Sequence, residues 1–278
     1  MKEGVCQDYQ FQGQLSKLLY FESSKLDAGE TTSLDEYVGR CAPDQKEIYF
    51  LCAPTRELCL ASPYMEAFEG SGREVVFVYT AIDDFVMSNL RTFEDRELVT
   101  AEKGGLSVDK TKKEDGDEEG EDGKKKKEGG EEDEEKKADD AMDQVDADIL
   151  CGWMQNVALG GKVESVKTTT RLGRSPAIVT GHESGALRQM MKQVDTQGNA
   201  TGTGSALGAQ AFEINPSHSV IKAIAALSKG GGEKEEMAKI AAEQVFHNAV
   251  VNAGLMDDAR HMIPNINRLL EEVLKVRK

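Results

Sequence analysis

The sequence predicts an α/β protein (α+β in its second half): a small αβα segment, a disordered charged linker, and an α+β domain that ends in a helical hairpin. Strand-like and helix-like runs alternate before the linker, which favours a parallel sheet. Two amphipathic helices close the chain. With 278 residues, 39% of them hydrophobic, the chain is long enough to build two cores.

The linker is predicted from a charged run over residues 109–140, with 16 acidic and 9 basic residues and Ala138 as its only apolar side chain. Such a run buries too little apolar surface to offset the entropy lost on ordering, so we expect residues 106–142 to be disordered. Subtracting its charge of −7 from the net −16 leaves −9 on the folded parts. This charge argues against nucleic acid and anionic membranes as partners.

The first folded part is predicted to begin with a helical lead-in over residues 1–32, in which a helical pattern runs from Leu15 into Tyr20 and Phe21. An αβα segment is expected to follow over residues 33–105.

That segment opens with Ser33 and Glu36, which have the spacing of a helix capping box. Two buried strands are expected at "EIYFLCAP" and "REVVFVYTA", each followed by a helix. The first of these helices, "TRELCLASPYMEAF", should be interrupted at Ser62-Pro63.

No motif for catalysis or cofactor binding stands out. The turns after the strands, "CAPTRE" and "YTAIDD", contain neither GxGxxG nor GxxxxGK[ST], so a phosphate site is not expected. Asp83 and Asp84 are expected to cap a helix rather than act as paired catalytic carboxylates. Because the cysteines form no CxxC pair and the four histidines are scattered, we expect no metal site and reduced, buried thiols at Cys6, Cys41, Cys52, Cys59 and Cys151.

The second folded part, residues 143–278, is predicted to mix helices with short strands. "DADILCGWMQNVALG" reads as an amphipathic helix with Trp153 in the core, "KVESVKTTTRL" and "SPAIVTGH" as strands, and "ESGALRQMMKQV" as a helix. Further along, Phe212 and Ile214 alternate with Glu213, which is typical of a half-buried strand.

The Asn215-Pro216 step is expected to turn the chain from that strand into the next helix. Proline disfavours the helical conformation in the residue before it and is tolerated in the first turn of a helix. The helix should bury its apolar residues at helical spacing: Val220, Ile221, Ile224 and Leu227.

The last two helices form the predicted hairpin. "KEEMAKIAAEQVFHNAVVNAG" should end at Gly254, and Asp257 or Asp258 should cap the final helix. That helix carries apolar residues at spacings of 4, 3, 4 and 3, which is a heptad seam. One interpretation is that the hairpin packs on its own domain. The other is a homodimer through a four-helix bundle, with the interface formed by Met237, Ile240, Val245, Ala249, Met262, Ile266, Leu269, Val273 and Val276.

Seven segments in their order along the chain resemble the ninety-kilodalton heat-shock chaperone family: "LLYFESSKL", "TSLDEYVGR", "IYFLCAP", "SPYMEAF", "DDFVMSNLRTF", "EINPSHSVIK" and "NAVVNAGLMDD". "LLYFESS", "YFLCAP" and the ending "LLEEVLKVRK" are most similar to its mitochondrial, tumour-necrosis-factor-receptor-associated branch. The resemblance covers nearly everything outside the linker. It departs from the family in one respect, since the family's charged linker usually separates the first two domains.

The resemblance implies that the chain begins late in the middle domain, so that Met1 is an internal cut, and continues into the dimerisation domain. In the family, ATP and magnesium bind in the amino-terminal domain, and the arginine that reaches the γ-phosphate lies upstream of Met1. We therefore expect no ATPase activity, no catalytic residue and no cofactor on this chain. The family's compartment here is mitochondrial, with cytoplasm or plastid as alternatives, and "MKEGVCQDYQ" shows no presequence pattern.

The resemblance also implies partners: a second copy of the chain, unfolded or partly folded client proteins, and full-length subunits of the same chaperone. The expected client contacts are Leu187, Met190 and Met191, on a helix where flexible methionines suit varied partners. Ordinary core packing is the alternative for these methionines. A regulatory or scaffold protein that kept the fold without the ATPase motor is the alternative function.

Overall fold

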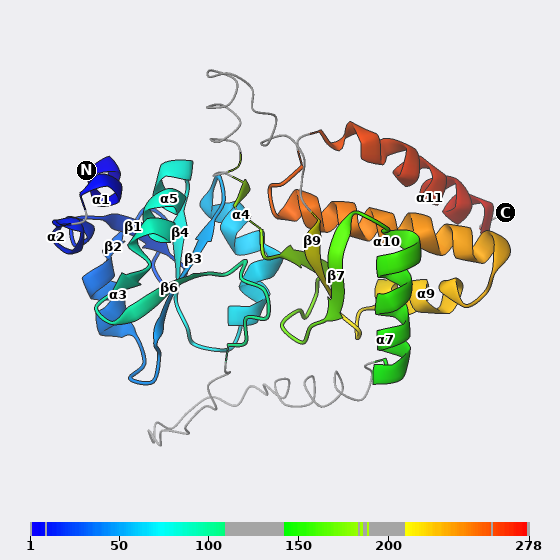
Figure 1. Cartoon of the computed structure of the whole chain (residues 1–278), viewed down its shortest axis with the longest axis horizontal. Coiled ribbons are helices and arrows are strands. Elements are labelled where there is room, and N and C mark those ends of the chain that lie inside the picture. The colour runs from blue at the N-terminus through cyan, green and yellow to red at the C-terminus, as the bar shows by residue number, and fades with distance from the viewer. Residues whose placement is uncertain are drawn as a thin grey trace, which may run out of the picture.

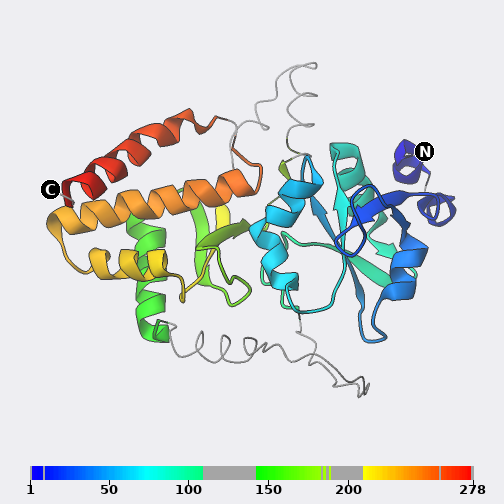
Figure 2. The ribbon, with the colours of Figure 1, turned by 180° about the vertical axis from the view of Figure 1, so that it is seen from behind.

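The computed structural model describes residues 2–8, 10–108, 142–182, 184–185, 188, 209–256 and 258–276. Its amino-terminal part contains a six-stranded sheet and its carboxy-terminal part a three-stranded sheet (Figure 1). The last two long helices run side by side along the outer edge of the second part, in both views (Figures 1 and 2). No helix in the described ranges has the length and apolar character that crossing a membrane requires.

The first sheet has the strand order β2-β1-β4-β3-β6-β5. Its centre is parallel, because β3 (Glu47–Cys52) pairs in parallel with both β4 (Val75–Val78) and β6 (Arg96–Thr100). The edges are antiparallel and are formed by β1 (Tyr20–Ser23), β2 (Thr32–Ser33) and β5 (Thr92–Phe93). All four residues of β4 are buried, as expected for a parallel strand covered on both faces.

The helices of the first part are α1 (Lys2–Gln7), α2 (Gln12–Ser16), α3 (Leu34–Arg40), α4 (Arg56–Ala61), a 3₁₀ helix η1 (Pro63–Phe68) and α5 (Ala81–Leu90). The capping box is confirmed: the Ser33 hydroxyl accepts from Glu36 N–H, and the Glu36 carboxylate accepts from Ser33 N–H. The predicted break at Ser62-Pro63 is confirmed as well, since α4 ends at Ala61.

Two expectations for the first part were wrong. Tyr20 and Phe21 do not continue a helix but form β1, because their backbone pairs with β2 and β4 from later in the chain. Asp83 and Asp84 lie in the first turn of α5, and the cap is Thr80, whose hydroxyl accepts from Asp83 N–H.

The second sheet has the order β7-β9-β8, with β7 (Val163–Thr168), β8 (Ala177–Thr180) and β9 (Gln210–Ile214). Strand β9 pairs in parallel with β7 and antiparallel with β8. It is therefore a central strand, and the expectation of a half-buried strand was wrong. Glu213 in its middle is buried, with its carboxylate accepting from Thr180 Oγ1 and Gly105 N–H and paired with Arg171.

Beside this sheet the described part of the chain contains α7 (Gln144–Trp153), which continues as a π-helical turn η2 (Met154–Ala158), then α9 (Ser219–Ser228), α10 (Gly232–Asn252), a 3₁₀ turn η3 (Ala259–Met262) and, against α10, α11 (Ile263–Val276). Trp153 is half-buried and packs against the core, as predicted. The thiols of Cys41, Cys52, Cys59 and Cys151 are free, although Cys41 and Cys52 are only half-buried.

The Asn215-Pro216 corner is confirmed, with a correction to the helix that follows. Helix α9 begins at Ser219 and its cap is His218, so Pro216 precedes the helix rather than occupying its first turn. The buried Asn215 side chain holds the corner by donating to the carbonyls of Leu172 and Ser175, at 3.2 and 3.3 Å. Ile221 and Ile224 are buried and Leu227 is partly buried, but Val220 is exposed, contrary to expectation.

One hydrophobic cluster joins the two sheets. It contains Tyr49 and Phe77 from the first part together with Phe212 and Val245 from the second. A second cluster lies on the opposite face of the first sheet. The two parts are therefore packed on one another through a continuous apolar core.

Polar contacts reinforce this junction. The Tyr64 hydroxyl donates to the Val179 carbonyl at 2.5 Å. The Glu66 carboxylate accepts four hydrogen bonds from residues 173–175: from Gly173 N–H (2.6 Å), Arg174 N–H (2.9 Å), Ser175 N–H (3.3 Å) and the Ser175 hydroxyl (2.6 Å). We call this arrangement the Glu66 clasp.

Candidate functional site

Helix α10 lies with one side against its own domain. Val245, Phe246 and Ala249 are buried in the core cluster, and the rings of Phe246 and Phe212 meet edge to face at 5.5 Å. Ala242, about one turn before Val245, is a small residue buried in the same cluster, and α10 contacts β8 of the sheet. This side of α10 therefore already packs within the chain.

Helix α11 turns back along α10 and leaves an apolar face uncovered. Leu269 is half-buried, whereas five apolar residues of α11 remain exposed: Ile263 (50%), Ile266 (38%), Leu270 (53%), Val273 (56%) and Leu274 (63%). At 3.6 residues per turn these five fall within an arc of about 100°. We call them the α11 face.

The hairpin is held by its turn and by polar contacts between the helices. Gly254 has a left-handed φ of +66°, which glycine adopts without strain, and the Asp258 carboxylate caps η3 by accepting from Arg260 N–H at 2.9 Å. Glu243 of α10 accepts from Asn265 of α11 at 3.2 Å and pairs with Lys162 at 2.9 Å. The prediction that Gly254 ends the helix and Asp258 caps the next one is confirmed.

Charges near the hairpin are tuned by these contacts. Burial alone would raise the pKa of Glu243, but the hydrogen bond and charge of Lys162 and the Asn265 amide outweigh it and lower this pKa. The pKa of His247 is lowered, first by burial and then by the charges of Lys162 and His261. The rings of His247 and His261 meet edge to face with centroids 5.2 Å apart. The lowered pKa values keep Glu243 ionised and His247 neutral near neutral pH.

A groove lies between the end of α10 and the start of α11, with a volume of about 630 Å³. Its walls combine apolar side chains with a polar rim: Asn248, Val251, Asn252, Ala259, Arg260, Met262, Ile263 and Ile266. Because Ile263 and Ile266 belong to both features, the groove and the α11 face form one continuous surface.

The structure separates the predicted interface residues into two groups. Ile240, Val245, Ala249 and Met262 are buried within the chain and Met237 is half-buried, while Ile266 and Val273 are exposed. The Val276 side chain lies outside the described residues, as do the expected client contacts Leu187, Met190 and Met191.

Sequence reasoning missed Val251, which is 44% exposed and lines the groove. It lies at the end of α10, next to the buried Val250, so periodicity alone does not separate the two. Within the described ranges, no three histidine, cysteine, aspartate or glutamate side chains are grouped as metal ligands would be.

Taken together, the fold and this surface define an α/β protein with an uncovered apolar helical hairpin, an arrangement typical of chains that associate with another chain. Comparison with known proteins specifies it further. The family model described as "Hsp90 protein" matches residues 1–278. The chain therefore belongs to the Hsp90 family.

Relatives come from eukaryotes and bacteria. The chain is 36% identical over 280 residues to the mitochondrial TNF receptor-associated protein 1 homolog of Dictyostelium discoideum, covering 98% of the chain and 35% of that protein. It is 34% identical to the chaperone protein HtpG of Desulfitobacterium hafniense (99% and 40%) and 33% identical to the mitochondrial heat shock protein 75 kDa of Bos taurus (99% and 36%). The chain thus spans between 35% and 40% of the length of these relatives.

Membership of this family supports a chaperone role, and it confirms the resemblance stated from the sequence. The matching relatives include mitochondrial proteins, bacterial HtpG and a plant endoplasmin homolog, so their names do not indicate a single cellular compartment.

Proposed function

We propose that this chain is the carboxy-terminal part of an ATP-dependent molecular chaperone and supplies homodimerisation together with part of the client-binding surface. The observation that carries the proposal is the α11 face, whose five apolar side chains are between 38% and 63% exposed. In the family, the ATP and magnesium sites and the catalytic arginine lie upstream of the region that this chain matches, and we propose no cofactor or catalytic residue within residues 1–278. Its proposed compartment is mitochondrial, after two of the relatives.

The dimer uses the α11 face and the groove in an isologous interface, in which each copy offers the same surface to the other. Burying a half-exposed Leu, Ile or Val contributes about 1 kcal/mol. The five side chains of the α11 face, counted once in each subunit, therefore contribute about 10 kcal/mol to association. Association costs about 4–15 kcal/mol in lost freedom, a comparable amount. The α11 face therefore needs the groove, with Val251 and the polar rim, to complete a stable dimer.

We propose the following units within the chain: a middle-domain lead-in over residues 1–32, an αβα segment over residues 33–105, a linker over residues 106–142 and a dimerisation domain over residues 143–278. The junction described above lies between the second and the fourth. Of the residues predicted for the interface, Ile266 and Val273 contact the partner directly, whereas Ile240, Val245 and Ala249 support α10 from within the subunit.

Client contact is proposed for Leu187, Met190 and Met191. Methionine is flexible and polarizable, which suits contact with many sequences. Ser184 and Gly185, which precede these residues in the sequence, contact both parts of the chain: Ser184 donates to Asp84, and Gly185 lines a cavity with residues of the first part.

The dimer is tested by sedimentation velocity of the parent chain and of Leu270→Asp. Leu270 is 53% exposed, so the substitution leaves the monomer fold intact while placing an unpaired charge in the interface. We expect a dimeric parent at tens of micromolar and a monomeric variant. Asn267→Asp, on an exposed polar position of the same helix, is the matched control and should remain dimeric. A monomeric parent would refute the dimer.

The client surface is tested separately with Met190→Asp. We expect this variant to dimerise like the parent and to suppress aggregation of an unfolding test protein less effectively. Loss of dimerisation, or unchanged suppression, would contradict the assignment.

A further inference from the structure

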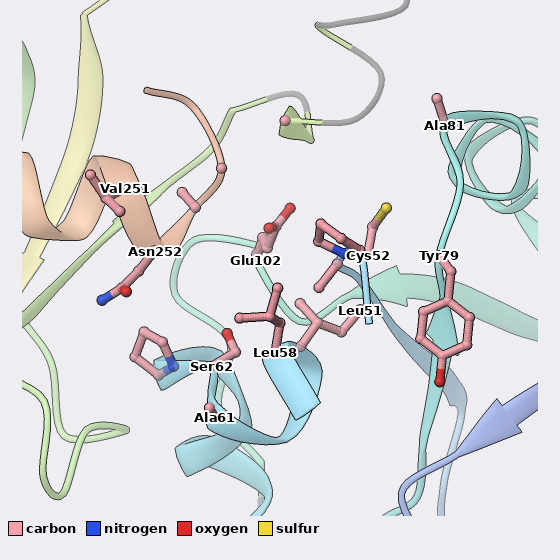
Figure 3. Close-up of a pocket in the computed structure, with 16 residues that line it drawn as sticks. Leu51, Cys52, Leu58, Ala61, Ser62, Tyr79, Ala81, Glu102, Val251 and Asn252 are labelled. Atoms are coloured by element: carbon pink, nitrogen blue, oxygen red, sulfur yellow. The ribbon is translucent and has the colours of Figure 1, made fainter. Parts of the chain in front are cut away.

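A cavity of about 670 Å³ lies where the two folded parts meet, away from the α11 face (Figure 3). The first part contributes residues 51–54 at the carboxyl end of β3, the end of α4, Tyr79 and Ala81 before and in α5, and Glu102 after β6. The second part closes it with Gly185 and with residues 251–254 at the end of α10.

The position of this cavity follows from the sheet. Strands β4, β3 and β6 are parallel neighbours, so their carboxyl ends meet at one edge, and the cavity lies directly beyond that edge. Open α/β sheets bind ligands in the crevice outside the carboxyl ends of their strands. A volume of this size is typical of small-molecule sites.

The walls are mainly apolar. Figure 3 shows Leu51, Leu58, Ala61 and Val251 around the hollow, and Pro54 and Pro63 extend the apolar lining. Glu102 is the one carboxyl group among the described lining residues, and lysine and arginine are absent from that set. The site therefore combines an apolar body with a single acidic group.

Glu102 is buried, with 5% of its surface exposed, and its carboxyl group lies between Cys52 and the end of α10 (Figure 3). No described residue donates a hydrogen bond to this carboxyl group. Buried carboxyl groups in native proteins are normally paired or hydrogen-bonded, because an unpaired one is costly. The cavity is the remaining direction from which a donor can reach it.

The charges around Glu102 come from both parts. The pKa of Glu102 is raised to about 8, first by burial and then by the charge of Asp84 on α5, while the charge of Arg171 acts in the opposite direction. Arg171 also pairs with Glu213, its Nε lying 3.5 Å from a Glu213 oxygen, so its charge is shared between the two glutamates. Tyr64 and the thiols of Cys52 and Cys59 also face this group. Glu102 is the carboxyl group that lines the cavity and Asp84 adds a second acidic group near it, so the cavity favours a cation over an anion.

We infer that this cavity binds a small apolar molecule carrying one basic nitrogen, with the nitrogen donating to the Glu102 carboxylate. A neutral apolar ligand would leave Glu102 unpaired, and an anion would be repelled. The protonated amine takes the place of the proton on Glu102, which is released to solvent on binding. The inference does not depend on the proposed dimer or on client binding.

The test is calorimetric titration of the whole chain with three probes of one shape: 2-naphthylmethylamine, 2-naphthylmethanol and 2-naphthoate. We expect the amine to bind about tenfold or more tightly than the alcohol, and the carboxylate not to bind. Titrations near pH 7 in two buffers of different ionisation enthalpy should show proton release, and the affinity for the amine should rise from about pH 6 to about pH 8.5.

Three variants locate the site. Glu102→Gln should weaken amine binding about tenfold or more and abolish proton release, because it removes the charge while keeping the shape. Glu97→Gln, on the exposed side of β6, is the matched control and should bind like the parent. Ala61→Trp, at an exposed position on the rim, should fill the cavity and block binding without changing charge.

Equal affinity for amine and alcohol, amine binding that is unchanged in Glu102→Gln, or no amine binding at millimolar concentration would each overturn the inference.

Discussion

The Glu66 clasp makes the coupling between the two parts of the chain measurable. Glu66 lies on η1 in the first part, and its carboxylate accepts hydrogen bonds from residues 173–175 in the connection between β7 and β8. Glu66→Ala removes the acceptor and leaves the donors in place. Because all four donors belong to the second part, the change in the free energy of unfolding measures the contribution of contacts between the two parts.

The expected cost can be worked out from the exposure of each contact. A hydrogen bond to a charged group contributes about 1.5–3 kcal/mol when it is buried. The N–H groups of Gly173 and Arg174 are exposed, so water can accept their hydrogen bonds when Glu66 is removed. The loss of each of these two hydrogen bonds should therefore lower the free energy of unfolding by about 0.5 kcal/mol at most. The two contacts with Ser175 are partly buried and should cost about 1 kcal/mol each. We therefore expect Glu66→Ala to lower the free energy of unfolding by about 2 kcal/mol.

Urea denaturation monitored by far-ultraviolet circular dichroism checks this value. Glu69→Ala is the matched control, because Glu69 pairs with the neighbouring Arg174 while both side chains are mostly exposed. Such a surface pair should contribute less than about 0.5 kcal/mol. If Glu66→Ala and Glu69→Ala differ by less than about 0.5 kcal/mol, the clasp does not stabilise the junction and the reasoning is refuted.

Two further predictions concern the same junction. Burial alone would raise the pKa of Glu66, but the hydrogen bonds from residues 173–175 outweigh it and hold the pKa below the ordinary 4.5. The free energy of unfolding that the ionised Glu66 contributes is therefore fully present above pH 4.5 and is lost as pH falls through the lowered pKa. The difference in unfolding free energy between the parent and Glu66→Ala should therefore shrink on acidification below about pH 4.5, and a difference that grows would contradict the assignment. Gly185→Ala should destabilise the chain by about 2 kcal/mol in the same urea assay, because a Cβ there would lie 2.4 Å from the Gly254 carbonyl oxygen; a change below about 0.5 kcal/mol would show that the backbone relaxes freely.

Elements set by local chemistry could be predicted from the sequence. The capping box at Ser33 and Glu36, the break at Ser62-Pro63 and the left-handed turn at Gly254 each depend on residues within a few positions of one another. Their physical causes are therefore visible in a short stretch of sequence. The buried strands β3 and β4 were predicted for the same reason, from continuous apolar runs.

Elements set by distant partners could not be predicted in this way. Strand β1 looks helical in isolation and becomes a strand because β4 pairs with it from more than fifty residues away. Strand β9 alternates like a half-buried strand, yet two neighbours cover it and Glu213 is neutralised by Arg171. Short-range pattern says nothing about which strand lies next to which.

The hairpin shows an intermediate case. Periodicity identifies an apolar stripe on α11, but it does not say which part of the stripe the chain itself covers. Leu269 is half-buried and Leu270, one residue further along, is 53% exposed. Glu66 and Glu102 were not predicted at all, since a single glutamate carries no spacing signal and its role depends on a neighbour from the other part of the chain.

Helix α10 connects the features described above. Its middle is buried in the core, so the helix is fixed to the second sheet. Its last turn carries Val251 and Asn252, which line both the groove beside α11 and the cavity between the two parts. A helix of 21 residues is about 30 Å long and stiff, so a shift at one end is felt along its length. A substitution or ligand that displaces Val251 or Asn252 in the cavity therefore also alters the wall of the groove where the proposed dimer surface begins.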